Sequence, residues 1–371
     1  MVKRGFRGLG LGLLAALWLW GCTGGGTPAV PADRTQAVSE NRDGSTQAAS
    51  ENQNGSTQTA QEAQDSSTQA ASENQNGNAQ NGGPADRYGE IIDRSGDEGK
   101  LTVCFFDLEV GPDAKDKSGD AAVLISPDGK VMLLDAGHPD AGGIVVRTLK
   151  DMGIEKIDYL VASHPHIDHI GGVPEVLENF PVEKAYRSYL TYTTQTYQNY
   201  VEALETHEID TESLKTGDSF SFGSQVQVEV LGPEEEIVYP DGFPENSTQF
   251  INDHSLVLKF TYGESTALFC GDLYRSAERE YLEKYGDKLQ ADLVKANHHG
   301  KDTSNSKKWI KTVHAKVVGA MGDEVGSMNV YNDYVKEGAE YHMTVNDGFI
   351  KIRMDDAGNY EVIDQKDSWM N

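Results

Sequence analysis

The densest group of potential ligand side chains lies in Ser163-His164-Pro165-His166-Ile167-Asp168-His169-Ile170-Gly171-Gly172. Three histidines and one aspartate fall within six consecutive positions. His164 and His166 are expected to project together from an extended loop, whereas Asp168 and His169 begin the next turn and point to a second centre about 3.5 Å from the first. Imidazole nitrogens and carboxylate oxygens suit zinc and manganese. The spacing therefore predicts a site for two divalent metal ions.

Alternating strands and helices must position these side chains, and the apolar pattern predicts them over 87–371. The predicted strands are Leu101–Leu108, Ala121–Ser126, Lys130–Asp135, Ile157–Ala162, Val226–Leu231, Ser255–Tyr262, Thr266–Cys270, Asp292–Ala296, Ala315–Ala320, Gly348–Met354 and Tyr360–Ile363. The predicted helices are Gly143–Met152, Ala277–Tyr285 and Ser306–Thr312. Strands outnumber helices in each half of this region. We therefore expect an α/β sandwich of two mixed sheets, with helices outside and the site at an edge where loops converge.

Four further segments follow or precede predicted strands: Asp135-Ala136-Gly137, Asn252-Asp253-His254-Ser255, Gly271-Asp272 and Asn297-His298-His299-Gly300. Together with the His-x-His-x-Asp-His signature, they resemble the metallo-β-lactamase superfamily. Val110-Gly111, Gly119-Asp120-Ala121 and the Asn-x-x-Ser-Leu-Val-Leu segment are similar to the extracellular hydrolase domain of the ComEC family of competence proteins. The resemblance runs from Leu101 nearly to the end, and it implies a four-layer αββα sandwich.

The resemblance implies a ligand set. The implied ligands are His164 and His166 for the first metal, Asp168, His169 and His298 for the second, and Asp272 for both. The two oxygens of Asp272 suit a bridging role, because each could hold one cation. His299 is the alternative to His298, since adjacent residues at a strand end point in different directions.

Two positions around this set remain to be filled. Asp135 would orient a ligand histidine through its carboxylate. The third ligand of the first metal is open: His254 is one candidate, and Asn252 or water are the others. Asp168 and Asp272 are the residues expected to take part directly in catalysis.

Two zinc ions, or alternatively manganese, would lower the pKa of a bridging water toward about 7 and generate hydroxide for attack on phosphorus or an acyl carbon. The proton for the leaving group could come from His254, from Lys301 or from a tyrosine among Tyr189, Tyr192, Tyr197 and Tyr200. The same tyrosines could instead stack on a substrate or pack an amphipathic helix.

The amino terminus has the order of an export signal, because Lys3, Arg4 and Arg7 precede an apolar run from Leu9 to Trp20. Cys22 follows in a context that resembles the lipobox of bacterial lipoproteins, although Trp20 departs from the pattern. We expect a signal peptide over 1–21 and a lipidated Cys22 on the outer face of the cell membrane; the alternative is simple secretion.

Residues 22–86 are polar and of low complexity, with Ser-Glu-Asn recurring at Ser39, Ser50 and Ser72. Such composition predicts a disordered linker before a hydrolase domain over 87–371. The whole chain of 371 residues has a formal net charge of −27, which argues against a broad basic surface for nucleic acid. Three cysteines cannot form a disulfide framework, and Cys104 and Cys270 are expected to be buried thiols in strands.

Together with the export signal, the resemblance to the competence hydrolases implies an exported, membrane-tethered phosphodiesterase or nuclease that acts on a phosphodiester substrate. DNA is one such polymer, and the basic residues available to hold it are Lys301, Lys307, Lys308 and Lys311. The alternatives are hydrolysis of another extracellular ester, such as phosphocholine on wall polymers or a lactone, and a lipoprotein that binds a ligand without catalysis. The sequence leaves the oligomeric state open.

Overall fold

The computed structural model describes residues 86–109, 119–235, 244 and 246–367. These residues all belong to one compact unit, Gly77–Asn371. The predicted signal peptide, Cys22 and all but the last residue of the predicted linker lie outside the described residues. Within the described part, no helix is long and apolar enough to cross a membrane.

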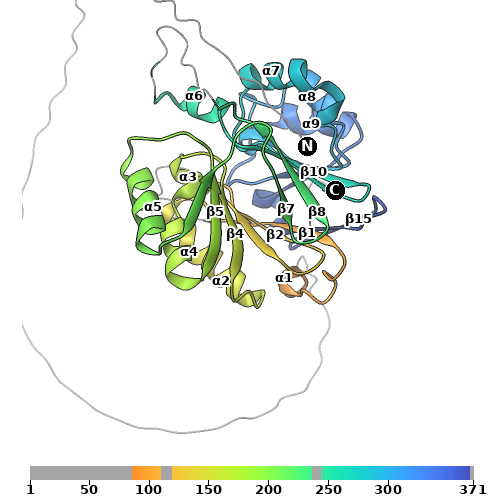
Figure 1. Ribbon diagram of the computed structural model, residues 1–371. Helices are drawn as coiled ribbons and strands as arrows, with labels where there is room; N and C mark the ends of the chain where they lie inside the picture. The colour runs from red at the N-terminus through yellow and green to blue at the C-terminus, as the bar shows by residue number, and fades with distance from the viewer. Residues whose placement is uncertain (1–85, 110–118, 236–243, 245, 368–371) are drawn as a thin grey trace, which may run out of the picture. The chain divides into compact units, whose positions relative to one another are not determined.

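Two mixed β-sheets form the centre of the fold (Figure 1). The first sheet contains β1 (Leu101–Phe105), β2 (Ala122–Ile125), β3 (Val131–Leu134), β4 (Ile157–Ala162), β5 (Val182–Arg187), β6 (Asp210–Ser213), β14 (Ile350–Met354) and β15 (Tyr360–Asp364). Its order is β15-β14-β1-β2-β3-β4-β5-β6. Neighbours from β3 to β6 are parallel, and the other pairs are antiparallel.

The second sheet contains β7 (Ser219–Phe222), β8 (Val226–Gly232), β9 (Val257–Tyr262), β10 (Ser265–Phe269), β11 (Leu293–Lys295), β12 (Val317–Ala320) and β13 (Glu340–Met343). Its order is β13-β12-β11-β10-β9-β8-β7. Here β10 to β13 are parallel neighbours, and β7 to β10 are antiparallel.

Helices cover the outer face of each sheet, which gives four layers (Figure 1). The helices on the first sheet are α1 (Tyr88–Ile92), α2 (Gly142–Asp151), α4 (Val173–Asn179) and α5 (Gln195–Thr206), and those on the second are α7 (Arg275–Tyr285), α8 (Lys307–Val313) and α9 (Met328–Lys336). Side chains alternate along the strands, as the period of two requires. In β1, Val103 and Phe105 face the core between the sheets, whereas Cys104 faces the helices.

The fold class and all the strands predicted from the apolar pattern are confirmed, with ends that shift by up to three residues. The sequence pattern missed β5, β6, β7 and β13. Three of these are outer strands of a sheet. An outer strand is partly solvated and carries polar side chains, as Asp210–Ser213 does, so its apolar signal is weak.

Candidate metal centre

The predicted ligands lie on connections that follow β4, β10 and β11, and Asp135 follows β3. Ser163 to His166 leave β4, and α3 (Ile167–Ile170) begins directly afterwards with Asp168 in its first turn. Asp272 follows β10, and the short 3-10 helix η3 (Asn297–Gly300) follows β11. Because β3 and β4 are parallel, and β10 and β11 are parallel, the carboxyl ends of each pair meet at one edge. Both sheets therefore contribute side chains to one site.

One oxygen of Asp272 is the point on which the histidines converge. Asp272 Oδ2 lies 3.2 Å from His299 Nε2 and 3.3 Å from His169 Nε2. It lies 3.8 Å from His298 Nε2 and 4.0 Å from His164 Nε2. Asp272 is only 2% exposed. Four imidazoles around one buried carboxylate oxygen are an arrangement typical of metal ligands.

Asp168, His169, Asp272 and His299 form the tightest part of the cluster, since each offers one ligand atom within 4.8 Å of the others. His299 Nε2 lies 3.3 Å from Asp168 Oδ2. The Nε2 atoms of His169 and His299 are buried without a hydrogen-bond partner. Buried polar atoms without partners are rare, and here they point to one centre. These residues fit a divalent metal ion.

The structure puts His299, rather than His298, in this tightest group. Sequence analysis assigned the ligand role to His298 and kept His299 as the alternative. Both residues have left-handed backbone, with φ of 48° and 55°. Two consecutive left-handed residues turn the chain so that the second imidazole enters the cluster, and His298 lies at its rim.

A buried polar network holds this strained turn. Asn297 Nδ2 donates to Glu278 Oε1 at 2.9 Å, and the Asn305 amide donates to the Asn297 carbonyl at 2.8 Å. Glu278 Oε2 also accepts the Ser306 N–H at 2.8 Å. Glu278 is fully buried on α7. The cost of left-handed backbone at two non-glycine residues is thus opposed by hydrogen bonds outside the cluster.

His164 and His166 form a second pair, with His164 Nε2 and His166 Nδ1 3.0 Å apart. His166 Nε2 is buried without a hydrogen-bond partner, and so are both side-chain polar atoms of Asn252, at the end of α6 (Thr248–Asp253). Burial lowers the pKa of His166, and Asp168, Asp272 and Asn252 oppose this shift in part. Asn252 therefore lies beside the first pair.

His254 is placed elsewhere. Its Nδ1 lies 2.8 Å from the Phe250 carbonyl, at the end of α6. It lines a separate hollow with Asp253 and Tyr281. Of the two side chains left open by sequence analysis, the structure brings Asn252 to the first pair and does not bring His254.

Two carboxylates orient the imidazoles. Asp135 Oδ2 lies 2.8 Å from His169 Nδ1, and Asp135 also accepts the Ser163 N–H and hydroxyl, both at 2.7 Å. Asp120 Oδ1 lies 3.0 Å from His299 Nδ1. Each contact ties up Nδ1 and leaves Nε2 directed at Asp272, as carboxylate partners of ligand histidines do. Sequence analysis foresaw Asp135 in this place and assigned no role to Asp120.

Lys295, at the end of β11, is a buried cation that sequence analysis also missed. Its Nζ forms an ion pair with Asp120, donates to the Gly271 carbonyl at 2.8 Å and lies 3.3 Å from Asp272 Oδ1. One oxygen of Asp272 thus faces Lys295, and the other faces the histidines. This corrects the expectation that both oxygens of Asp272 are available to metals. A lysine inside the apolar run before the His-His pair was the available signal.

The cluster carries an excess of acid. The cluster contains four carboxylates, those of Asp120, Asp135, Asp168 and Asp272, and one lysine, Lys295, which contacts Asp120 and Asp272. Burial raises the pKa of the Asp272 carboxyl, but His299, His169 and Lys295 outweigh burial and hold the pKa well below its usual range. Divalent ions would supply the positive charge that such a cluster requires.

Three of the four tyrosines singled out near position 190 divide into two groups. Tyr197 and Tyr200 are buried in the core under α5, so they pack the helix. Tyr192 instead lies beside the first histidine pair, with its ring centroid 5.5 Å from that of His166. Burial raises the pKa of Tyr192. A substrate held near His166 would therefore meet a protonated phenol.

Cys104 and Cys270 are free buried thiols, as predicted. They belong to the two different cores under the helices of each sheet. Burial raises the pKa of the Cys104 thiol to about 12, which makes it chemically inert at neutral pH.

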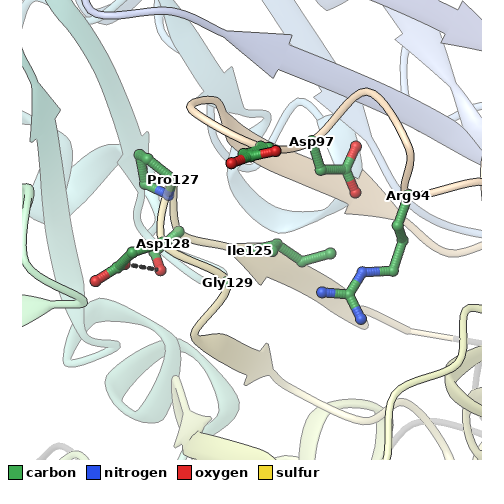
Figure 2. A pocket seen from close by; sticks show the side chains of 8 residues that line it. Arg94, Asp97, Ile125, Pro127, Asp128 and Gly129 are labelled. Atoms are coloured by element: carbon green, nitrogen blue, oxygen red, sulfur yellow. Dashed lines mark hydrogen bonds between the residues drawn. The ribbon is translucent and has the colours of Figure 1, made fainter.

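A cavity of about 350 Å³ lies beside the β2–β3 turn and is separate from the cluster. Figure 2 shows Arg94 and Asp97 on one side of it and Pro127 and Asp128 on the other. Asp97 is held by Arg353, whose Nε donates to it at 2.8 Å. No residue that lines this cavity belongs to the histidine cluster.

Residues 118–317 match the model of the metallo-beta-lactamase superfamily. The chain belongs to this superfamily. ComE operon protein 3 of Bacillus subtilis (strain 168) is 26% identical over 181 residues, which cover 48% of this chain and 22% of that protein. Competence protein ComA of Neisseria gonorrhoeae is 26% identical over 193 residues, 52% of this chain and 24% of that protein. The match thus spans about a quarter of the length of these two relatives.

Among solved structures, Zn²⁺-bound PqqB from Methylobacterium extorquens has a TM-score of 0.40 and 11% identity, covering 66% of this chain and 97% of that one. The similarity to the competence proteins expected from the motifs is confirmed at this distant level. Family membership and the buried histidine–aspartate cluster together assign the chain to the metal-dependent hydrolases.

Proposed function

We propose that this chain is a phosphodiesterase that uses two divalent metal ions, zinc or alternatively manganese. The observation that supports it most is the convergence of the Nε2 atoms of His164, His169 and His299 on Asp272 Oδ2 within 4.0 Å, next to Asp168. The residues that would hold the ions are His164 and His166 for one, Asp168, His169 and His299 for the other, and Asp272 for both. Ions held there would supply Lewis acidity and lower the pKa of water.

The chain's own residues have defined tasks in this proposal. Asp135 and Asp120 keep His169 and His299 in the tautomer that presents Nε2. Lys295 fixes the orientation of Asp272. Tyr192 is our candidate for the proton donor to the leaving group, because a phenol can donate a proton and the ring of Tyr192 lies beside His166.

Similarity to competence proteins supports a phosphodiester substrate, and DNA is the polymer we propose. Lys307, Lys308 and Lys311 are exposed on α8, and Lys301 directly follows η3. Trp309 and Ile310 on the same helix are buried, so the lysines face solvent. With a chain charge of −27, only such a local basic strip could hold a polyanion.

A substrate panel on the metal-loaded full chain tests the activity. Bis(4-nitrophenyl) phosphate and DNA should be cleaved, Asp168→Asn should abolish cleavage, and Asp287→Asn, at an exposed carboxylate outside the cluster and the basic strip, should leave it unchanged. Cleavage of DNA should weaken steeply with salt, and Lys307→Glu with Lys308→Glu should remove it without affecting the small substrate. If no phosphodiester is cleaved, the proposal is refuted. Turnover of a phosphocholine ester or a lactone would then favour hydrolysis of another extracellular ester. Metal-loaded protein that turns over none of these substrates would favour a lipoprotein that binds a ligand without catalysis.

We further propose export and anchoring through a lipidated Cys22, supported by the order of basic residues, apolar run and cysteine in the sequence. Cys22→Ser should release the protein from the membrane fraction into the medium. Retention of the variant in the membrane would contradict lipid anchoring, and release of the unaltered chain would favour simple secretion.

A further inference from the structure

A second group of ligand-type side chains lies where the outer strands of the two sheets meet. His342 is on β13, Asp364 ends β15, and Asp347 ends the short helix α10 (Thr344–Asp347). Each offers one ligand atom, and these atoms lie within 4.8 Å of one another. Because β13 and β15 belong to different sheets, this group spans the sandwich at one edge.

Two atoms of this group lack hydrogen bonds although they are buried. His342 is 9% exposed, and its Nδ1 lies 2.9 Å from Asp364 Oδ2. The other ring nitrogen, His342 Nε2, and the other carboxylate oxygen, Asp364 Oδ1, are buried without a hydrogen-bond partner. Burying such atoms unsatisfied costs free energy, so their presence in one group indicates a missing ligand.

The local charge indicates which ligand fits. Glu340 Oε2 lies 3.9 Å from His342 Nε2, which adds a third carboxylate to Asp347 and Asp364. Burial lowers the pKa of His342, yet Asp364, Asp347 and Glu340 outweigh burial and raise the pKa overall. Three carboxylates around one imidazole give the group an excess of negative charge. A divalent cation complements it, and the combination of imidazole and carboxylate donors suits zinc.

We propose that His342, Asp347 and Asp364 bind a zinc ion that joins β13, α10 and β15. Another side-chain link between these outer strands is the Tyr360 hydroxyl, which donates to Glu340 Oε1 at 2.9 Å. An ion in this position stabilises the edge of the sandwich and takes no part in hydrolysis. The site is independent of the proposed function, since no residue is shared with the Asp272 cluster.

Zinc stoichiometry of the full chain tests the proposal. By equilibrium dialysis and metal analysis, the unaltered chain should bind one equivalent more than His342→Gln or Asp364→Asn. A matched control is His207→Gln. His207 Nε2 also lies near a carboxylate, 3.4 Å from Glu178 Oε1, but His207 belongs to none of the groups of metal-ligating side chains in the described residues. The control should retain the full stoichiometry. Equal stoichiometry in folded His342→Gln and unaltered protein would overturn the proposal.

A second measurement needs no substitution at the site. Zinc should slow hydrogen exchange in peptides covering 340–347 and 360–366 of the unaltered chain, and the same protection should persist in Asp168→Asn, whose substitution lies in the other cluster. If zinc does not change hydrogen exchange in these two segments, the proposal is contradicted, even if the site variants fail to fold.

Discussion

Lys295→Met should destabilise the chain by an amount that depends on bound metal. Lys295 is 2% exposed, and its Nζ lies 3.3 Å from Asp272 Oδ1 and pairs with Asp120. Unit charges at that distance attract by about 5 kcal/mol at an effective dielectric constant of about 20. Removing one partner of a buried pair leaves the other charge uncompensated and costs about 3–5 kcal/mol.

Metal ions change this cost, because divalent charge beside Asp272 partly replaces the missing ammonium. We expect the full 3–5 kcal/mol loss in the presence of chelator and a loss smaller by at least ~1 kcal/mol with zinc. By linkage, the variant should therefore bind zinc more tightly than the unaltered chain does. Urea unfolding with chelator and with saturating zinc measures both losses, and metal titration checks the affinity.

The matched control is Lys351→Met. Lys351 is also fully buried, and its Nζ lies 3.2 Å from Asp97 Oδ1, away from the cluster. Its loss of stability should be the same with zinc and with chelator. If the Lys295→Met loss were equally indifferent to zinc, or larger with zinc, Lys295 would not be compensating the charge of the cluster.

Four further substitutions probe the site. Asp135→Ala should weaken zinc binding by roughly 10–100-fold, because His169 Nδ1 loses its partner; unchanged affinity in metal titration would contradict that role. His299→Ala should lose about one metal equivalent relative to the unaltered chain and the activity, whereas His298→Ala should keep the full stoichiometry of the unaltered chain; the reverse result in metal analysis would restore His298 as the ligand. Tyr192→Phe should lower kcat on a phosphodiester with a poor leaving group by at least ~10-fold and spare one with a 4-nitrophenolate leaving group. Equal kcat losses on both substrates would mean that Tyr192 does not donate the proton.

The central strands and the local motif could be predicted because their signals are local. Ile157–Ala162 is apolar at every position except Asp158, and His164 to His169 follow it directly in the sequence. Because these six positions are adjacent in the chain, the backbone itself holds their side chains close together, and their spacing alone predicts the metal site. The choice between His298 and His299 is different, because it depends on two left-handed residues held by Glu278 from another helix. Nothing within the Asn297–Gly300 segment specifies that contact.

The contact between Asp120 and Lys295 could not be predicted from local sequence either, because the two residues are far apart in the chain. They are 175 positions apart in sequence, and they meet because β2 and β11 lie in different sheets that pack face to face. Asp120 reaches His299 from the first sheet, and Lys295 reaches Asp272 from the second. The motif thus identifies which residues can bind metal, whereas packing of the two sheets decides which atom of each residue faces it. A change that shifts one sheet against the other should therefore disturb the metal site even where every motif residue is retained.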